Sequence, residues 1–203
     1  MRSALFLVAL LLSGPALADH PEDKLDEAMA EKEAAFEATD VRRPPKLELV
    51  DGAGGPFSLD SLVDQIVVLS FVPEGCGAPC AAQQALLARV RGAVNITPMR
   101  DMVTFIVVAE AVARGEKAGA SNVITADASD GAVVAALAAR FGQLSSREES
   151  GPQVHLIDRG RRHAGIFHGA KFGYLNMVLY INGLTNAPPR EARLLDRVLE
   201  LIR

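Results

Sequence analysis

Three uninterrupted apolar runs constrain the fold of this chain most strongly. They are QIVVLSFV at residues 65–72, MVTFIVVA at 102–109 and QVHLID at 153–158. The first two contain almost no polar residue, and β-branched side chains are frequent in all three. Short runs of this kind are typical of strands that are buried on both faces of a sheet. They therefore predict the core of a central sheet.

Helical patterns alternate with these runs. AAQQALLARVRGAV at 81–94 and SDGAVVAALAARFG at 129–142 predict helices, and RRHAGIFH at 161–168 predicts a hairpin partner for 153–158. KLELVDGAGGPFSL, at 46–59, predicts two short strands around a glycine turn. The alternating order indicates an α/β fold with a central mixed sheet. In such folds the functional loops lie at the carboxyl ends of the central strands.

The segments before and after this pattern are less regular. Residues 21–40 are rich in Glu and Ala, and Pro44 and Pro45 end any helix there. We therefore expect a helical leader and linker over 19–45 and the globular domain over 46–203. The apolar stretch 173–184 is too short to span a bilayer, which leaves a buried helix or a partner-docking surface as alternatives. The residues 188–202 predict an amphipathic C-terminal helix.

The first residues resemble an export signal. Arg2 precedes an apolar run at 4–12, and the sequence Ala16-Leu17-Ala18 is a typical cleavage site. We expect cleavage after residue 18 and a periplasmic or otherwise exported protein with no membrane span after cleavage. The net charge of −4, with Lys and Arg scattered along the chain, argues against a nucleic-acid partner.

Cys76 and Cys80 are the only two cysteines, and they follow the first apolar run directly. The start of the next helix stabilises a thiolate, because the helix dipole and free backbone N–H groups favour negative charge there. Two soft thiolates at this spacing suit Cu(I) better than Zn(II), and the same pair can close a disulfide. The pattern therefore leaves open a copper site, a redox dithiol and a structural disulfide. Cross-linking a loop this short adds little to the stability of the fold, because it removes little chain entropy from the unfolded state, and this disfavours a purely structural disulfide.

The chain resembles the Sco/SenC group of copper-handling proteins in the thioredoxin superfamily. The resemblance is carried by LELVDGAGGPFSLDSLVDQIVVLSFV, by the Cys76-x-x-x-Cys80 spacing before a helix, and by GPQVHLIDRGR, and it covers roughly residues 46–168. It implies a thioredoxin-like fold in which Pro152 is a cis-proline that faces the two thiols. It also implies that copper is the metal carried and that a copper-receiving or cysteine-containing exported protein, such as a respiratory oxidase subunit, is the partner.

The histidine that binds copper in this family has no counterpart here. The corresponding stretch, SSREESGPQ at 145–153, contains none, and Ala81 replaces the proline that usually follows the second cysteine. His155 and His168 are therefore the candidate additional metal ligands. Two-residue periodicity places His155 on one strand face with Ile157, and it predicts opposite faces for His163 and His168.

Three hypotheses for the function remain. The first is copper delivery on Cys76 and Cys80. The second is thiol–disulfide exchange in which Cys76 attacks and Cys80 resolves, either during copper-site assembly or as a general oxidoreductase. The third is a non-catalytic thioredoxin-fold binding module with a structural disulfide. The missing histidine favours exchange over copper storage, and the cysteine spacing favours the Sco/SenC group over a general reductase.

Overall fold

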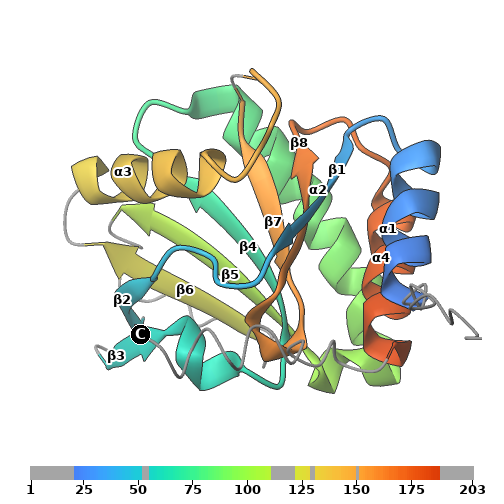
Figure 1. Cartoon of the computed structure of the whole chain (residues 1–203). Helices are drawn as coiled ribbons and strands as arrows, with labels where there is room; N and C mark the ends of the chain where they lie inside the picture. The colour runs from blue at the N-terminus through green and yellow to red at the C-terminus, as the bar shows by residue number, and fades with distance from the viewer. Residues whose placement is uncertain (1–20, 52–54, 111–121, 129–130, 150, 188–203) are drawn as a thin grey trace, which may run out of the picture.

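The computed structural model describes residues 21–51, 55–110, 122–128, 131–149 and 151–187. Helices cover both faces of an eight-stranded mixed sheet with the order β1-β8-β7-β4-β5-β6-β2-β3 (Figure 1). The strands are β1 (Phe36–Val41), β2 (Glu48–Asp51), β3 (Pro56–Ser58), β4 (Ile66–Val72), β5 (Val103–Glu110), β6 (Val123–Ala128), β7 (Gln153–Ile157) and β8 (His163–His168). The α-helices are α1 (Pro21–Lys32), α2 (Gly77–Asn95), α3 (Gly131–Gly142) and α4 (Tyr174–Asn186). Three short 3-10 helices are η1 (Leu59–Leu62), η2 (Pro98–Asp101) and η3 (Arg159–Arg161).

Strand β4 lies in the middle of the sheet, as its uniformly apolar sequence predicts. It pairs with β5 in parallel and with β7 in antiparallel orientation. Ile66 and Val68 enter the hydrophobic cluster formed with α2 and α4, whereas Val67 and Leu69 enter the cluster formed with α3. The expectation of a strand buried on both faces is therefore confirmed.

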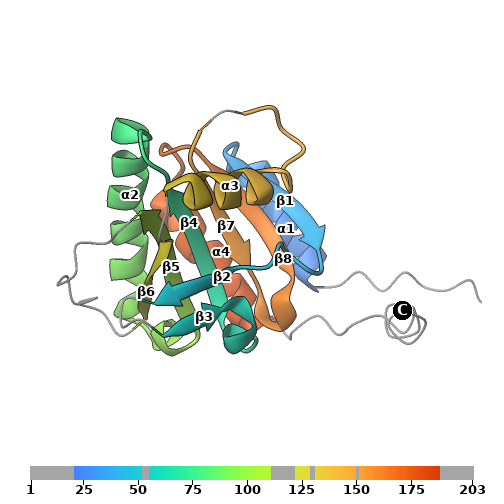
Figure 2. The ribbon, with the colours of Figure 1, turned by 90° about the vertical axis from the view of Figure 1, so that its left-hand side faces the viewer.

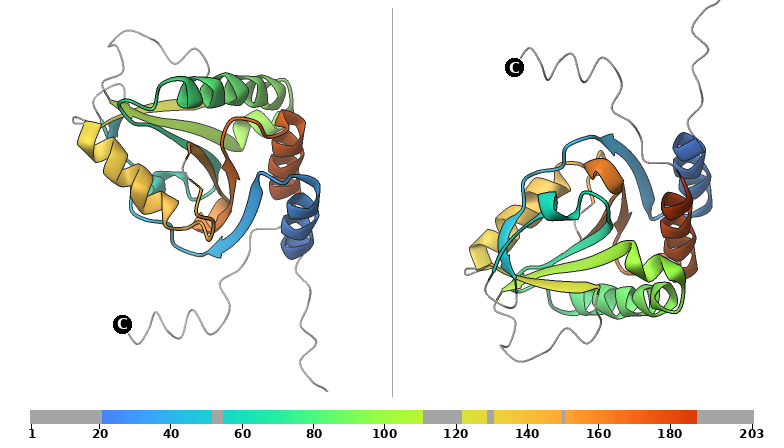
Figure 3. Two further views of the ribbon diagram at one scale, coloured as in Figure 1. Left: turned by 90° about the horizontal axis from the view of Figure 1, so that it is seen from above. Right: turned by 90° about the horizontal axis from the view of Figure 1, so that it is seen from below.

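The helices form two layers. Figure 3 shows α2, α4 and α1 on one side of the sheet and α3 on the other. Figure 2 shows α3 running across the strands, with the β2–β3 hairpin on the same side. Leu49 and Phe57 of that hairpin share a hydrophobic cluster with Val134 and Leu137 of α3. This arrangement leaves the carboxyl end of β4 between the start of α2 and the end of α3.

The apolar stretch 173–184 forms helix α4, and one side of it is buried. Met177, Tyr180, Ile181 and Leu184 are fully buried and pack in the cluster that includes α2. Leu175 and Leu179 remain exposed on the opposite side. The packed side of α4 therefore agrees with the first of the two alternatives for this stretch, a buried helix. No helix in the described part of the chain is long and apolar enough to cross a membrane.

The sheet begins earlier in the chain than the sequence predicted. Residues 36–41, expected as leader or linker, form edge strand β1 and pair with β8. Gly165 of β8 makes room for Phe36, since a Cβ at residue 165 would fall 2.6 Å from Phe36 Cζ. Helix α1 packs on α4 in the same way, where a Cβ at Gly183 would fall 2.7 Å from Leu25 Cδ2. Both close approaches make residues before 46 part of the packed domain.

Strand β6 was not expected from the sequence, because its segment VITADA mixes apolar and polar residues. The expected export signal at 1–18 and the expected helix at 188–202 lie outside the described residues, so both stay predictions.

The contact between Gly165 and Phe36 yields a stability prediction. Gly165→Ala is expected to lower the free energy of unfolding by about 1–3 kcal/mol, because the new methyl group overlaps a buried ring and backbone. Gly92→Ala is the matched control: a Cβ there meets nothing within 4 Å, and a glycine in a helix costs about 0.5–1 kcal/mol relative to alanine. Urea unfolding measures both variants. Equal stability of Gly165→Ala and the wild type would contradict the assignment of β1 to the packed sheet.

Candidate functional site

The two cysteines lie in the loop that joins β4 to α2. Strand β4 ends at Val72, and Cys76 is the N-cap residue of α2. The backbone N–H of Cys76 donates to the carbonyl of Pro73 at 3.2 Å. Gly75 and Gly77 flank the cysteine with φ of +79° and +57°, a region that side-chain-bearing residues rarely adopt. The loop therefore holds Cys76 at the carboxyl end of the central strand, where the sequence predicted it.

Cys76 and Cys80 form a disulfide, with Cα atoms 5.7 Å apart. The two residues differ in exposure: Cys76 is partly exposed, whereas Cys80 is 1% exposed. The carbonyl oxygen of Phe71 lies 3.8 Å from Cys80 Sγ, where it can accept a hydrogen bond from the thiol once the disulfide is reduced. A carbonyl that accepts a hydrogen bond in this way favours the neutral thiol of Cys80. Cys76 is thus the sulfur that an external group can reach.

The start of α2 adds an electrostatic difference between the two sulfurs. No side chain caps this end of the 19-residue helix. The helix dipole and uncapped N–H groups favour a negative charge on a group at the N-cap. The thiolate form therefore suits Cys76, which is the assignment that the sequence predicted for the attacking thiol.

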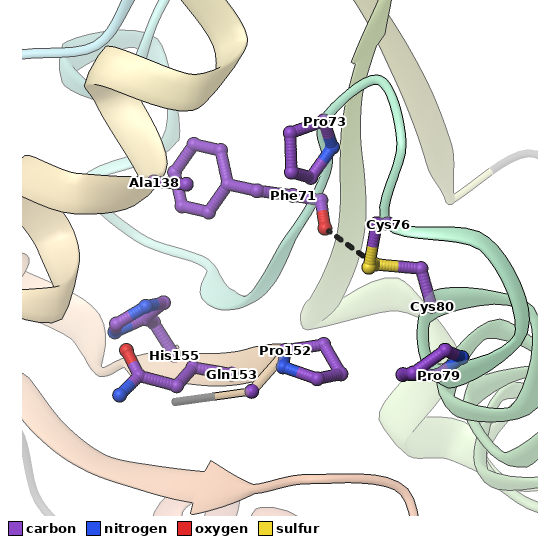
Figure 4. Close-up of a pocket in the computed structure, with 10 residues that line it drawn as sticks. Phe71, Pro73, Cys76, Pro79, Cys80, Ala138, Pro152, Gln153 and His155 are labelled. Atoms are coloured by element: carbon purple, nitrogen blue, oxygen red, sulfur yellow. Dashed lines mark hydrogen bonds between the residues drawn. A yellow bond between two sulfur atoms is a disulfide. The ribbon is translucent and has the colours of Figure 1, made fainter. Parts of the chain in front are cut away.

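A pocket of about 220 Å³ opens beside the disulfide (Figure 4). Pro152 and Phe71 lie between the disulfide and the His155 ring in that view. The full lining is Phe71, Pro73, Cys76, Pro79, Cys80, Ala138, Gly151, Pro152, Gln153 and His155. The structure thus brings Cys76, Cys80, Pro152 and His155, four of the predicted site residues, to one pocket. The expected cis bond before Pro152 is wrong, since the described residues contain no cis peptide bond.

His155 is a buried ring on the wall of this pocket. It lies between Phe71 and Phe141, with ring centroids 6.0 and 5.2 Å away in edge-to-face contacts. It shares the α3 side of the sheet with Ile157, whereas Val154 and Leu156 enter the other cluster, as the alternation predicted. Burial, and then the electrostatic influence of the neighbouring His163 and His168 rings, hold the pKa of His155 well below its usual value.

His163 is a site residue that sequence reasoning placed wrongly. Its Nε2 lies 3.0 Å from Nδ1 of His155, and its Nδ1 lies 2.7 Å from the hydroxyl of Thr39 on β1. Burial, with the positive charge of Arg162, lowers the pKa of His163 to about 3. The three residues Thr39, His163 and His155 form a hydrogen-bonded chain from the edge of the sheet to the pocket. Nothing in the sequence signals this chain, because it joins three strands.

The predicted opposite faces for His163 and His168 are also wrong. The register shifts between Leu156 and Ile157, so that His163 pairs with Ile157 while His168 pairs with Gln153. Gln153 and Ile157 point to the same face of β7, and their partners point there too. An irregularity of one residue in β8 therefore brings both histidines to the side of the sheet that carries His155.

His168 is engaged away from the pocket. Its Nε2 lies 2.8 Å from Glu37 Oε2, and its Nδ1 lies 3.6 Å from the carboxylate of Glu149. Burial alone would raise the pKa of Glu37, but hydrogen bonds from Ser145, Ser146 and His168 lower it to about 2. The pairing ties β1 to the segment that leads toward Pro152. His168 as a metal ligand stays a prediction, and the described residues contain no group of three or more His, Cys, Asp or Glu that could hold a metal.

Comparison with solved structures places the fold among thioredoxin-like proteins. A SCO1/SenC family lipoprotein from Bacillus anthracis superposes with a TM-score of 0.59 at 13% identity, covering 74% of this chain and 98% of that protein. Copper-bound yeast Sco1 gives a TM-score of 0.55 at 12% identity, covering 75% and 98%. A thioredoxin-family thiol:disulfide interchange protein from Chlorobium tepidum gives 0.50 at 17% identity, covering 73% and 98%. No family model and no curated protein sequence matches the chain.

These similarities establish the fold. The α/β, thioredoxin-like architecture predicted from the sequence is confirmed, and Sco/SenC proteins are among the structural neighbours. At identities of 12–17% the similarity extends to the arrangement of strands and helices. The chemistry of this chain therefore has to be argued from its own disulfide and pocket.

The buried Glu37 carboxylate yields a pH-dependence prediction. Its pKa rises from about 2 in the folded chain to about 4.5 on unfolding, so the unfolded state binds more protons between these pH values. The stability that Glu37 contributes is therefore complete above pH 4.5 and is lost as the pH falls toward 2. Glu37→Gln should lower the free energy of unfolding at pH 7 by about 1.5–3 kcal/mol and flatten its acid-side slope. Denaturant unfolding from pH 7 to pH 2 measures both effects.

Glu149→Gln is the control for this series, because the Glu149 side chain is 53% exposed. An exposed ion pair contributes about 0–1 kcal/mol, so its loss should leave the slope nearly unchanged. Parallel pH profiles of the wild type and Glu37→Gln would show that Glu37 does not carry the predicted stability.

Proposed function

We propose that this chain is an exported thioredoxin-fold protein that uses the Cys76–Cys80 pair in thiol–disulfide exchange and Cu(I) delivery during the assembly of a copper site. The observation that carries the proposal is the asymmetry of the disulfide. One sulfur is accessible at a helix N-terminus and the other is buried below it, on a pocket large enough to admit part of a partner. The respiratory oxidase as recipient rests on the Sco/SenC resemblance of the sequence.

The exchange step begins from the reduced pair. The Cys76 thiolate attacks one sulfur of a partner disulfide, so a Cys76–partner disulfide forms and the second partner sulfur leaves as a thiolate that takes up a proton. Cys80 then loses its proton and attacks Cys76 Sγ, which breaks the mixed disulfide and releases the partner sulfur that was bonded to Cys76 as a thiolate, which takes up a proton. The partner is reduced by two electrons and the Cys76–Cys80 disulfide forms. A dithiol protein of the same compartment has to reduce that disulfide before the next cycle.

Copper enters this scheme as cargo. Cu(I) is a soft cation that prefers thiolate ligands, and reduction of the disulfide frees two of them. In the closed disulfide the same sulfurs are bonded to each other, so metal release and disulfide formation are linked. His155 lines the pocket with both cysteines, and its role as a third ligand stays a prediction.

Export is supported by two separate features. Residues 1–18 have the pattern of a cleaved signal. The closed disulfide fits an oxidising compartment, where disulfides persist. Both features agree with a protein that works outside the cytosol.

A general thiol–disulfide oxidoreductase is the second candidate. The closed state of the pair favours it, because exchange with partners needs only the accessible Cys76 sulfur and the resolving Cys80. A non-catalytic binding module with a structural disulfide is the remaining alternative. Metal titration and the reduction potential separate the three.

The copper proposal predicts one tight Cu(I) site in the reduced protein. Anaerobic titration against a Cu(I) chelator should give one equivalent for the wild type and none of comparable affinity for Cys76→Ser or Cys80→Ser, since each variant removes one of two thiolates. The oxidised wild type is the control and should bind no copper tightly. Binding that survives in Cys76→Ser would refute this site. His155→Phe and His168→Gln, titrated in parallel, test the two histidines as ligands.

The exchange proposal predicts a catalytic reduction potential. Equilibration with dithiol buffers should place the Cys76–Cys80 couple at about −120 to −270 mV, the range of exchange proteins. In the reduced protein, iodoacetamide should modify Cys76 well before Cys80, because only Cys76 is accessible. A potential below about −300 mV would instead identify a structural disulfide.

A further inference from the structure

The pocket beside the disulfide is mostly apolar. Phe71, Ala138 and three prolines line it together with the cysteines. Its polar side chains are Gln153, which is partly exposed, and His155, which is buried. Its volume of about 220 Å³ is smaller than the roughly 300–1,000 Å³ of sites for small-molecule cofactors. A space of this size and polarity fits one large side chain of a bound partner.

The hydrogen bonds behind His155 determine which of its nitrogens carries the proton. The hydroxyl of Thr39 has one hydrogen, and it donates this hydrogen to the carbonyl of His163 at 2.8 Å. The same hydroxyl lies 2.7 Å from His163 Nδ1, so it must accept there, and His163 carries its proton on Nδ1. The His163 ring is fully buried, and among the described residues its nitrogens are hydrogen-bonded to Thr39 and His155 and to no carboxylate, so the ring is neutral and Nε2 holds a lone pair.

The same reasoning extends to the pocket wall. Because His163 Nε2 can only accept, Nδ1 of His155 at 3.0 Å must donate to it. The His155 ring is 1% exposed and is bonded to no carboxylate among the described residues, so it is neutral as well; its single proton is on Nδ1, and Nε2 is left with a lone pair. His163 is not part of the pocket lining, and no described residue is bonded to His155 Nε2. The Thr39–His163–His155 chain thus holds a hydrogen-bond acceptor ready at the wall of an apolar pocket.

An occupant that matches this wall is a flat apolar group with a hydrogen-bond donor at its tip. A tyrosine side chain has this form, whereas phenylalanine or leucine leaves the acceptor unpaired and a carboxylate meets a lone pair. The disulfide forms part of the same lining, so the occupant lies beside the sulfur that reacts (Figure 4). We propose that this pocket is a recognition subsite for a tyrosine that lies near the reactive cysteine of the partner, with the phenolic O–H donating to His155 Nε2.

This inference rests on the proposed exchange function and names its substrate class: a cysteine-containing polypeptide segment with a tyrosine beside the cysteine. Thr39 and His163 act as positioning residues, because they reach the occupant only through His155. A peptide-binding role for the pocket also agrees with its position between α3 and the start of α2.

The test measures how fast Cys76 attacks short peptides. The full chain carries Cys80→Ser, so the attached peptide is not released. Each peptide has one cysteine in a mixed disulfide with nitrothiobenzoate, and Tyr, Phe, Leu or Ala at one position within two residues of it. The Cys76 thiolate bonds to the peptide sulfur, the bond to nitrothiobenzoate breaks, and the coloured thiolate leaves with the electron pair. At one position Tyr should react about 3- to 10-fold faster than Phe, the effect of one hydrogen bond, and Ala should be slowest.

Variants of the chain assign the preference to the pocket. His155→Phe should abolish the difference between Tyr and Phe peptides. Thr39→Val should reduce it and Thr39→Ser should restore it, which a purely structural role of Thr39 would not produce. Ala138→Met fills the pocket from α3 and should remove the preference for both aromatic peptides. Circular dichroism shows whether each variant is folded. If His155→Phe does not fold, Ala138→Met still tests the pocket.

A small disulfide separates this proposal from the function on which it rests. Oxidised glutathione has no aromatic side chain for the pocket, so the rate of each folded variant with it serves as the reference, and each peptide rate is expressed relative to that reference. Equal rates for Tyr and Phe peptides, or a preference that survives in Ala138→Met, would overturn the subsite while leaving the exchange function intact. Failure of Cys76 to react with any disulfide would overturn the exchange function itself.

Discussion

The burial of β4 on both of its faces is the constraint on which the rest of the structure depends. Its side chains enter both hydrophobic clusters, so β4 cannot shift by one residue without exchanging the two sets. The loop after Val72 therefore starts from a fixed point at the centre of the sheet. Leu87, Val90 and Val94 anchor α2 on the same sheet and fix the other end of that loop. The different exposure of Cys76 and Cys80 follows from these two anchors, since Cys80 lies on the side of α2 that faces Phe71 of β4, whereas the residues between the two cysteines are exposed.

Edge strand β1 has a second role, which is to supply polar partners for the histidines. Glu37 pairs with His168, and two positions further Thr39 bonds His163. Alternate residues of a strand share a face, so both partners reach the side of the sheet that carries His155. The interaction with His168 involves the charged carboxylate of Glu37, whereas the interaction with Thr39 begins a hydrogen-bonded chain of neutral groups. The N-terminal segment thus determines the protonation of a ring that lines the pocket, although it lies more than a hundred residues away in sequence.

The sequence predicts those parts of the fold that depend on local apolar pattern. Strands β4, β5 and β7 follow from mostly apolar runs, and helices α2 and α3 follow from the helical patterns between these runs. The position of Cys76 follows from the end of the first run. Strand β1 could not be found in this way, because half of FEATDV is polar and its burial depends on the missing side chain of Gly165. The face of His163 depends on a register shift in β8, which is a property of strand pairing and leaves no mark on spacing. The sequence thus located the thiols and Pro152, whereas the hydrogen-bonded partners of the histidines required the tertiary structure.

The proposed functions share a single chemical switch, which is the bond between two sulfurs. Cu(I) needs both thiolates, whereas exchange ends with the two sulfurs joined, so one pair cannot hold copper and be oxidised at the same time. A partner segment in the pocket lies beside both sulfurs, and its cysteine can compete for the metal or for Cys76. In both metal transfer and exchange, the acceptor His155 Nε2 selects partner segments that carry a matching side chain beside the cysteine. It acts on that side chain and not on the cysteine sulfur. In the proposed scheme recognition is thereby separated from the chemical step, so the same pocket would serve a cysteine-containing partner in its oxidised and reduced forms.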